Sequence, residues 1–241
     1  MNSSRLPGKV MLELNGHPMI YWQIQRILQS ELIEDLVVAT STDSSDDVLV
    51  DFLNEQDVIV FRGSLNDVHS RYLAIVNSNP SVSTLVRLTA DCPLVMPDLL
   101  SEMLRQFNDS NFDYLTNCIN PSYPDGLDIE VFSRDSFLRM SLSDLSDQEK
   151  EHVTLRFRLR AQDFRIGETR HSTDLSAMRW TVDYKEDFEF VRSVFENFVG
   201  HESTFTLEDV LDLLQSHPEL NTQLPGTLRN IALQESESDT A

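Results

Sequence analysis

Three groups of residues in this chain could together carry out chemistry on phosphate. The first ten residues form a Ser-rich turn with two cations, Arg5 and Lys9, before an apolar segment. Such a turn can offer backbone N–H groups, hydroxyls and positive charge to a polyphosphate. Further along, Asp91 precedes a Cys-Pro pair and Asp183 ends an Arg-Trp-Thr-Val run. A phosphate-binding turn with two metal-competent carboxylates indicates a nucleotidyltransferase; taken alone, the first ten residues could equally be a frayed terminus.

The composition limits the partners that we expect. The 241 residues include 19 Lys and Arg against 40 Asp and Glu, for a net charge of −21. Nucleic acids and anionic membranes need a basic face, so we expect neither as a partner. A local cationic pocket and Mg²⁺ can still hold a nucleotide.

The cysteines and the hydropathy indicate the compartment. Cys92 and Cys118 have no metal-ligand spacing, which suits reduced thiols. The sequence has no apolar run of about 18 residues and no signal peptide. We therefore expect a cytoplasmic protein.

Strands and helices alternate along the first half of the chain. Short apolar runs predict strands at residues 35–40, 58–61, 84–89 and 112–116; apolar periodicity, capping patterns and Pro97 predict helices at 18–30, 44–55, 64–77 and 97–108. The short connections indicate an α/β fold with a mostly parallel sheet covered on both faces. Ligands bind such sheets at the carboxyl ends of strands, where Arg62, Asp91 and Asn117 fall.

The pattern changes after about residue 121. Residues 127–132 alternate as an antiparallel strand would, helices are expected near 134–142 and 147–161, and strands near 164–168 and 178–182. We interpret residues 121–180 as an α/β excursion over the active-site edge and a candidate dimer contact. Amphipathic helices follow at 186–197 and 207–216. We expect one nucleotidyltransferase domain at 1–225 and a polar tail at 226–241.

Six segments carry a family pattern. They are Ser-Ser-Arg-Leu-Pro-Gly-Lys at 3–9, Phe-Arg-Gly-Ser at 61–64 with Asp67 and Arg71, Arg-Leu-Thr-Ala-Asp-Cys-Pro-Leu at 87–94, Tyr-Pro-Asp-Gly-Leu-Asp-Ile-Glu-Val-Phe at 123–132, Glu-His-Val-Thr at 151–154 and Arg-Trp-Thr-Val-Asp at 179–183. Together they resemble the cytidylyltransferases of the spore-coat polysaccharide biosynthesis protein F type, which are similar to the synthetases of CMP-Kdo and CMP-acylneuraminate. The resemblance implies a three-layer, nucleotide-diphospho-sugar-transferase-like sheet. It also implies transfer of CMP from CTP to a sugar or sugar acid, with release of pyrophosphate.

The start of the chain departs from that family. Family members open with an apolar strand and a Gln-Ala-Arg-like turn before the Ser-Arg-Leu-Pro motif, whereas this sequence starts at Met1, within that turn. We expect the first strand to be missing, through a start codon assigned too late or through a true truncation that damages the site. A sheet without its central strand would leave backbone groups unpaired, which favours the misassigned start.

The resemblance implies roles for the phosphate and metal residues. Ser4, Arg5 and Lys9 would bind the triphosphate, and Arg5 and Lys9 would neutralise the departing pyrophosphate. Asp91 and Asp183 would hold Mg²⁺, which takes one or two carboxylates together with phosphate oxygens. The alternatives are a strand-end turn residue for Asp91 and a helix N-cap for Asp183.

A second set would bind the rest of the nucleotide. Arg62 and Gly63 would approach the pyrimidine, where a Gly permits close contact. Arg87 and Thr89 would face the nucleotide, since an Arg inside an apolar strand needs an anionic partner. Two further residues lie on the helix that follows Ser64. Asp67 either binds the nucleotide or is the cap partner of Ser64, and Arg71, one turn later, could pair with Asp67.

A third set would serve the acceptor. Asp125, Gly126 and Glu130 would line its side of the site, with Gly126 in a turn. Glu151 and His152 are also candidates, and His152 either assists deprotonation or is structural. One residue would recognise a charged acceptor: Arg156, one helical turn after His152, would receive a sugar carboxylate or else form an exposed helical ion pair.

Two other functions stay open at the level of sequence. A nucleotide-sugar glycosyltransferase shares this kind of sheet, but its strand-end motif is usually Asp-x-Asp, whereas Asp91-Cys-Pro stands here. A non-catalytic nucleotide-binding protein would fit an absent first strand. The preference for cytosine and a homodimeric state rest on the resemblance alone, and the sequence does not name the acceptor.

Overall fold

The computed structural model describes residues 5–220. Ser4 and the predicted tail at 226–241 lie outside the described residues. The elements of the first half are η1 (Lys9–Met11), β1 (Glu13–Leu14), β2 (His17–Pro18), α1 (Met19–Ile27), β3 (Val37–Ser41), η2 (Ser44–Asp46), α2 (Asp47–Glu55), β4 (Ile59–Gly63), α3 (Val68–Ser78), β5 (Thr84–Arg87), α4 (Pro97–Asn108) and β6 (Tyr114–Thr116). Those of the second half are β7 (Glu130–Ser133), α5 (Arg134–Met140), α6 (Asp147–Glu151), α7 (Leu155–Leu159), η3 (Ala161–Asp163), β8 (Ile166–Glu168), α8 (Lys185–Asn197), α9 (Leu207–Ser216) and η4 (Pro218–Leu220).

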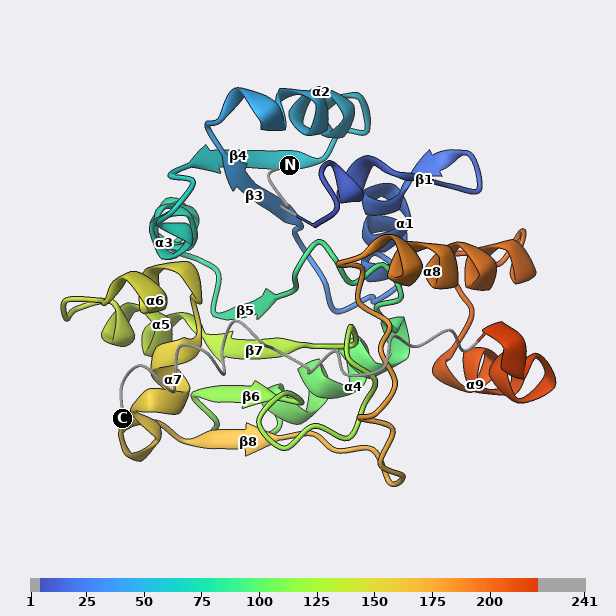
Figure 1. The fold of residues 1–241 in the computed structure, drawn as a ribbon. Coiled ribbons are helices and arrows are strands. Elements are labelled where there is room, and N and C mark those ends of the chain that lie inside the picture. Colours follow the sequence, from blue (N-terminus) through green and yellow to red (C-terminus); the bar gives the residue numbers. More distant parts are fainter. Residues whose placement is uncertain (1–4, 221–241) are drawn as a thin grey trace.

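The strands form three groups within residues 5–220. β1 and β2 make a short antiparallel hairpin, and β3 pairs in parallel with β4 from Val37 opposite Ile59 to Ser41 opposite Gly63. A four-stranded sheet has the order β5-β7-β6-β8 and lies below the β3–β4 pair in Figure 1. β7 is antiparallel to β5 and β6, whereas β6 is parallel to β8. The predicted α/β class and the antiparallel strand within 127–132 are confirmed.

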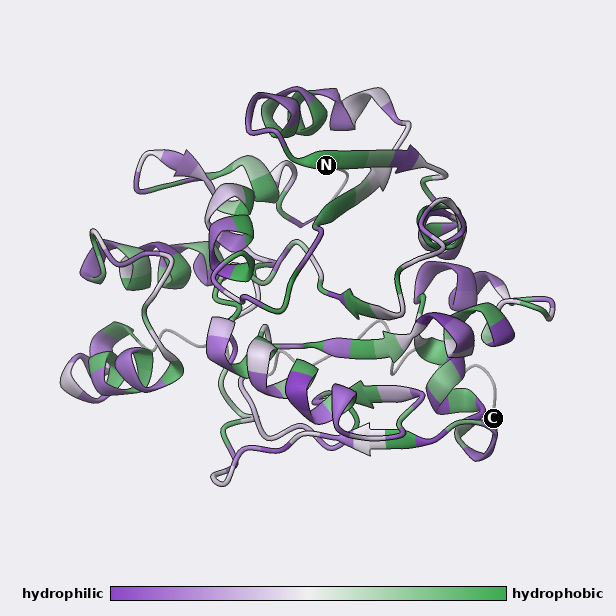
Figure 2. Cartoon of the chain, turned by 180° about the vertical axis from the view of Figure 1, so that it is seen from behind, coloured by the Kyte–Doolittle hydropathy of each residue, from purple (hydrophilic) through white to green (hydrophobic). Residues whose placement is uncertain are grey.

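Helices cover both faces of the four-stranded sheet. Leu115 and Val131 point into one apolar cluster with residues of α1, α4 and α8. Their chain neighbours Tyr114 and Phe132 point into a second cluster with Phe137 of α5 and residues of α7. Successive strand residues face opposite sides of a sheet, so each cluster lies between the sheet and the helices that cover one of its faces. The sheet and its two helical covers are the three layers that were predicted. In Figure 2 the outer helices carry hydrophobic and hydrophilic residues side by side, as covering helices do.

The region after residue 121 differs from prediction in two places. The helix expected at 147–161 is two helices, because His152, at φ −99° and ψ 77°, leaves the helical conformation after α6. The strand expected at 178–182 is absent, and only an isolated bridge joins Asp125 and Arg179. This segment bonds in turn to two other parts of the chain: Trp180 N donates to Asp125 O at 2.6 Å and Val182 N donates to Asp91 O at 2.8 Å.

The β3–β4 pair and the four-stranded sheet share no strand pairing within residues 5–220. The missing first strand of the sequence analysis stays a prediction. No helix in the same part of the chain is long and apolar enough to cross a membrane.

Candidate active site

Lys9 brings three distant parts of the chain together. Gly8, with φ +70°, turns the backbone into η1, which Lys9 begins. The Lys9 Nζ lies 3.1 Å from Asp91 Oδ2 and 3.0 Å from Asp183 Oδ1. It also donates to Val182 O at 2.7 Å. The predicted phosphate-binding cation and the two predicted metal ligands therefore meet at one point.

The backbone explains why the two carboxylates are neighbours. Asp91 lies in the turn after β5, and its carbonyl accepts hydrogen bonds from Val182 N and, at 3.3 Å, from Thr181 Oγ1. The turn after β5 and the segment before α8 are thus bonded directly to each other. Asp91 and Asp183 lie on either side of that junction.

Charge balance keeps this cluster ionised. Burial alone would lower the pKa of Lys9, but the Asp91 and Asp183 carboxylates outweigh it and raise the pKa above its ordinary value. Burial would likewise raise the pKa of Asp183, but Lys9 and Arg179 lower it. At neutral pH the ammonium and the Asp183 carboxylate are therefore both charged.

Arg179 connects the metal candidates to the predicted acceptor side. Its guanidinium donates to Asp125 Oδ2 at 2.9 Å, Asp183 Oδ2 at 2.8 Å and Asp187 Oδ1 at 3.1 Å, and the side chain is 10% exposed. Burial would lower the pKa of Arg179, but hydrogen bonds to Asp187 and Asp183 and the charge of Asp125 raise it. One buried cation thus fixes three carboxylates.

The N-cap alternative for Asp183 is wrong. Helix α8 begins at Lys185, and the carboxylate at its N-terminus is that of Asp187, which accepts from the backbone N of Asp183 at 2.8 Å and of Tyr184 at 2.9 Å. The Asp183 carboxylate bonds instead to Lys9 and Arg179. The Asp183 carboxylate is therefore part of the Lys9 cluster and not a helix cap.

Arg5 lies at the open edge of the same cluster. Its Nη1 is 3.2 Å from the Tyr184 hydroxyl and 3.9 Å from Asp183 Oδ2, and the side chain is 46% exposed. The guanidinium also lies 5.1 Å from the centroid of the Tyr184 ring. An exposed cation beside a buried ammonium suits an incoming polyphosphate.

Arg62 and Gly63 lie where β4 ends. Arg62 donates to Ser41 O and Asp43 O, both at 2.9 Å, and pairs with Asp47 at 2.8 Å. A Cβ on Gly63 would lie 2.7 Å from Arg71 Cγ, so a Gly is needed for the close approach of α3. Among the described residues, no hydrogen bond or ion pair joins this pair to the Lys9 cluster.

Asp67 and Arg71 do not pair with each other. Asp67 caps α3 by accepting from Ser70 N at 2.8 Å, and its own N donates to Ser64 Oγ. Asp67 thus contacts Ser64 as expected, but it is itself the N-cap of α3, which begins at Val68 and not near Ser64. Arg71 is buried and donates to Ala39 O at 2.9 Å, so the predicted Asp67–Arg71 pair is wrong.

Arg87 has the anionic partner that its position demanded, but the partner is a residue of the protein. Arg87 pairs with Glu130, whose other oxygen accepts from the Tyr114 hydroxyl at 2.6 Å and Thr154 Oγ1 at 2.5 Å. Burial would raise the pKa of Glu130, but Arg87, Thr154 and Tyr114 lower it. Glu130 is 7% exposed and both of its oxygens are bonded within the protein, so little of its side chain is open to the acceptor that it is predicted to line.

Thr89 and Gly126 each lie beside a segment that carries a predicted metal ligand. The Thr89 hydroxyl lies 3.3 Å from Cys92 Sγ, within the turn that carries Asp91. Gly126 has φ +108°, and a Cβ there would lie 2.4 Å from Thr181 N. Only a Gly allows the backbone after Asp125 to lie against the segment that carries Asp183.

The α6–α7 region corrects the predictions for Arg156. Arg156 is buried and pairs with Glu149, at 2.6 Å from Nε and 3.1 Å from Nη2, and it donates to the carbonyls of Met140 and Asp144. Both predicted roles, a receptor for a sugar carboxylate and an exposed helical ion pair, are therefore wrong. His152 is half-buried and lies between α6 and α7, and Glu151 is exposed. Burial lowers the pKa of His152.

The family of the chain follows from a direct comparison. The family model described as "Cytidylyltransferase" matches residues 1–220. The chain belongs to this cytidylyltransferase family. It is a CTP-dependent nucleotidyltransferase, as the resemblance implied, which decides against the glycosyltransferase and the non-catalytic alternatives.

Relatives of this cytidylyltransferase cover nearly its whole length. The "Spore coat polysaccharide biosynthesis protein SpsF" of Bacillus subtilis is 32% identical over 92% of this chain and 94% of its own. A solved cytidylyltransferase from Leptospira borgpetersenii is 29% identical, with a TM-score of 0.87 over 93% of this chain and 94% of that one. A solved CMP-2-keto-3-deoxy-manno-octonic acid synthetase, complexed with CTP, has a TM-score of 0.59 at 20% identity over 81% of this chain and 95% of that one, which shows the shared fold.

The donor set of the cytidylyltransferase fits a hard divalent cation. Asp91 and Asp183 offer carboxylate oxygens within 3.1 Å of a single point, the Lys9 Nζ. No group of three or more His, Cys, Asp or Glu side chains that could hold a metal is found within residues 5–220. Mg²⁺ suits such a two-carboxylate set, because it commonly fills its other positions with water and phosphate oxygens.

Sequence reasoning missed Arg179 and Asp187 as parts of this site. Arg179 opens the same motif that Asp183 ends, four residues apart, so an Arg buried beside a metal-competent Asp was a usable signal. Asp187 carried the signal of an acidic residue in the first turn of a predicted helix. Neither signal could show that one guanidinium joins Asp125, Asp183 and Asp187.

Proposed function

We propose that this cytidylyltransferase transfers CMP from CTP to a sugar or sugar acid and releases pyrophosphate, in the synthesis of a cell-surface polysaccharide or glycan precursor. The observation that carries the proposal is the placement of the Lys9 ammonium between Asp91 and Asp183. The name of the Bacillus subtilis relative and the acceptor of the synthetase that shares the fold support this substrate class.

The cations handle the leaving group. The acceptor hydroxyl attacks the α-phosphorus of CTP, a new P–O bond forms, and the bond to the pyrophosphate oxygen breaks. Negative charge then collects on pyrophosphate, and the positive charges of Lys9 and the exposed Arg5 would neutralise it. Ser4 would be a further phosphate ligand. Lys9 is held in place by Val182 O as well as by the carboxylates.

Asp91 and Asp183 would hold Mg²⁺, which when bound would withdraw charge from phosphate oxygens. Arg179 keeps the Asp183 carboxylate oriented and at the same time fixes Asp125 on the acceptor side. Positioning of this kind can supply much of the acceleration in phosphoryl transfer.

The remaining candidates complete the proposal. Arg62, Gly63 and Thr89 would contact the nucleotide. On the acceptor side, Glu151 and His152 would contact the acceptor, and neutral His152 can accept its hydroxyl proton, since burial lowers the pKa of that ring. The enzyme would act in the cytoplasm as a homodimer, which sedimentation analysis tests directly.

The first experiment is a thermal-shift panel of CTP, UTP, GTP and ATP, each with and without Mg²⁺. A ligand at 100 times its Kd stabilises the folded state by about 2.7 kcal/mol. We expect a Mg²⁺-dependent shift that is selective for CTP. Pyrophosphate release with CTP and a series of sugar acids and neutral sugars then identifies the acceptor. A shift with CTP but no release with any sugar would contradict the proposed acceptor class.

A further inference from the structure

A pocket lies away from the Lys9 cluster. Its volume is about 450 Å³, within the range of about 300–1,000 Å³ typical of small-molecule sites. It is formed by the residues before β5, the ends of β7 and α4, and the start of α5. It lies at the amino end of β5, whereas Asp91 follows the carboxyl end of the same strand. None of its lining residues belongs to the candidate active site.

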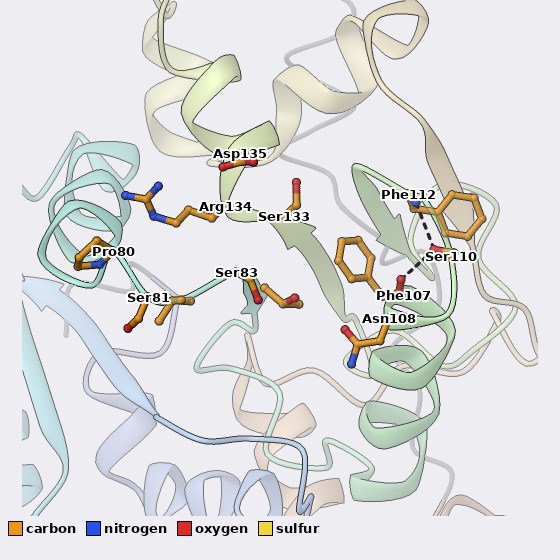
Figure 3. Close-up of a pocket in the computed structure, with 12 residues that line it drawn as sticks. Pro80, Ser81, Ser83, Phe107, Asn108, Ser110, Phe112, Ser133, Arg134 and Asp135 are labelled. Atoms are coloured by element: carbon orange, nitrogen blue, oxygen red, sulfur yellow. Dashed lines mark hydrogen bonds between the residues drawn. The ribbon is translucent and has the colours of Figure 1, made fainter.

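Strand pairing builds this pocket in advance of any ligand. Thr84 of β5 lies opposite Ser133 of β7 in the sheet. The next residue, Arg134, donates its backbone N to Ser83 O at 2.8 Å. The Ser133 hydroxyl is fixed in turn, because it accepts from Ser136 N at the start of α5. In Figure 3 Ser83 and Ser133 border the same space, with Arg134 extended along its edge toward Pro80.

Arg134 is the feature that points to a ligand. Its Nε is buried and has no hydrogen-bond partner, and no ion pair of Arg134 is present in the part of the chain that the structure describes. By contrast, Arg87, Arg156 and Arg179 each engage a carboxylate, and the buried Arg71 donates to the carbonyl of Ala39. Arg134 is half-buried at the edge of the pocket, and an oxyanion there would accept hydrogen bonds from the Nη groups of this unpaired cation.

Apart from the exposed Asp135 carboxylate at the start of α5, the other lining groups suit a hydroxylated molecule. Ser81, Ser83, Thr84 and Asn108 offer hydroxyl and amide groups, and Phe107 supplies an apolar wall. A few polar groups on a partly apolar wall fix the orientation of a small ligand. We propose that this pocket is a second binding site for a carbohydrate that carries one phosphate or carboxylate group, with Arg134 as its anion receptor.

The test uses the full-length, nitrogen-15-labelled chain and four probes: glucose 6-phosphate, gluconate, glucose and inorganic phosphate. We expect saturable shifts of the backbone amide signals of Ser83, Ser133 and Arg134 with glucose 6-phosphate or gluconate. Whichever of these two binds more tightly shows whether the pocket prefers a phosphate or a carboxylate. Glucose and inorganic phosphate should each bind at least about tenfold more weakly, because each lacks one half of the recognised group.

Three variants and one competitor decide the location. Arg134→Gln should weaken binding about tenfold or more, and Ser83→Trp, which fills the pocket at an exposed position without a change of charge, should abolish it. Arg170→Gln, which removes the same charge from another exposed surface, should leave binding unchanged. Saturating CTP should not displace the probe. Absence of shifts at these three amides, equal binding by Arg134→Gln and Arg170→Gln, or displacement by CTP would each overturn the proposal.

Discussion

Lys9 pairs with two carboxylates, so the loss of one still leaves its ammonium paired with the other. For Asp91→Asn we therefore expect a change in unfolding free energy of about 1 kcal/mol or less. Turnover should nevertheless fall by about 10³-fold, because a positioned charge is lost at the reacting phosphate. Pyrophosphate release and urea unfolding measure the two effects. Asp51→Asn, on the exposed side of α2, is the matched control. Substantial turnover in Asp91→Asn would refute the metal assignment.

Arg179 holds three carboxylates in a fixed geometry, which a point charge cannot reproduce. Arg179→Gln leaves Asp125, Asp183 and Asp187 without their shared cation, so we expect a loss of about 3 kcal/mol of stability. Arg179→Lys keeps the charge but not the fork, and should recover more stability than kcat. Arg192→Gln removes an exposed arginine paired only on the surface of α8 and should cost under about 1 kcal/mol. Equal kcat in Arg179→Lys and the parent would show that geometry at Asp183 is unimportant.

The sequence predicted which side chains lie together at the site better than it predicted which ion pairs they form. Arg5, Lys9, Asp91 and Asp183 meet as expected. The partner of a buried arginine, however, depends on tertiary contacts, and the sequence offered a ligand for Arg156 where the fold supplies Glu149. The sequence can thus show that a buried arginine needs an anionic partner, but it cannot show which residue that partner is.

At the scale of elements, the Glu149–Arg156 pair joins α6 to α7. Burial alone would raise the pKa of Glu149, but hydrogen bonds from Arg156 and Ser146 lower it from 4.5 to about 2. The folded state therefore binds this proton less readily than the unfolded state. The stabilisation is complete above about pH 4.5 and is lost as the pH falls toward 2.

Glu149→Gln should thus destabilise the protein by about 2–3 kcal/mol at pH 7. The gap between the variant and the parent should shrink as the pH falls from 4.5. Urea unfolding at a series of pH values measures both. Glu151→Gln, on an exposed side chain of the same helix, is the control. A gap independent of pH would mean that Glu149 acts through packing and not through its charge.

Gly126 tests how tightly the acceptor segment is held to the metal segment. Gly126→Ala combines a positive φ with a Cβ 2.4 Å from Thr181 N, so we expect a loss of about 3 kcal/mol or more together with reduced activity. Gly200→Ala is the matched control, since φ there is +84° and nothing lies within 4 Å of its Cβ. It should cost only about 1–2 kcal/mol of backbone strain. Equal losses in the two variants would show that the close approach is unimportant.

Local patterns predicted most elements because each has its own signal. Apolar runs marked β3, β4 and β5, and Pro97 marked the first residue of α4. The strand prediction for 178–182 failed because the backbone of this segment bonds in turn to two different parts of the chain, at Asp125 and at Asp91, and not to one neighbouring strand. The break at His152 was not predicted, because a run of helix-forming residues does not reveal where tertiary packing ends a helix.

For the whole molecule, the excess of acidic residues should make stability depend on salt. With 40 Asp and Glu against 19 Lys and Arg, repulsion between like charges opposes the compact state. The buried pairs, such as Arg156 with Glu149 and Arg179 with Asp125, are screened much less than exposed charges at ionic strengths where the Debye length is about 10 Å. Salt therefore weakens the repulsion more than it weakens the pairs. We expect Tm to rise when NaCl is increased from low to physiological concentration.

Differential scanning calorimetry at constant pH measures that rise, and a neutral osmolyte that is not a carbohydrate, at matched osmolality, controls for preferential exclusion. The Glu151→Gln and Asp51→Asn variants each remove one exposed negative charge, so their own salt dependence should be slightly shallower than that of the parent. A fall in Tm with added NaCl would mean that exposed ion pairs, such as those of Arg192, stabilise the fold more than the net charge destabilises it. Because CTP is itself a polyanion, the same net negative charge repels it, whereas the local field of cations at the site, such as Arg5 and Lys9, attracts it. The association rate of CTP should accordingly fall less steeply with salt than for an enzyme of opposite net charge, a comparison that stopped-flow binding makes directly.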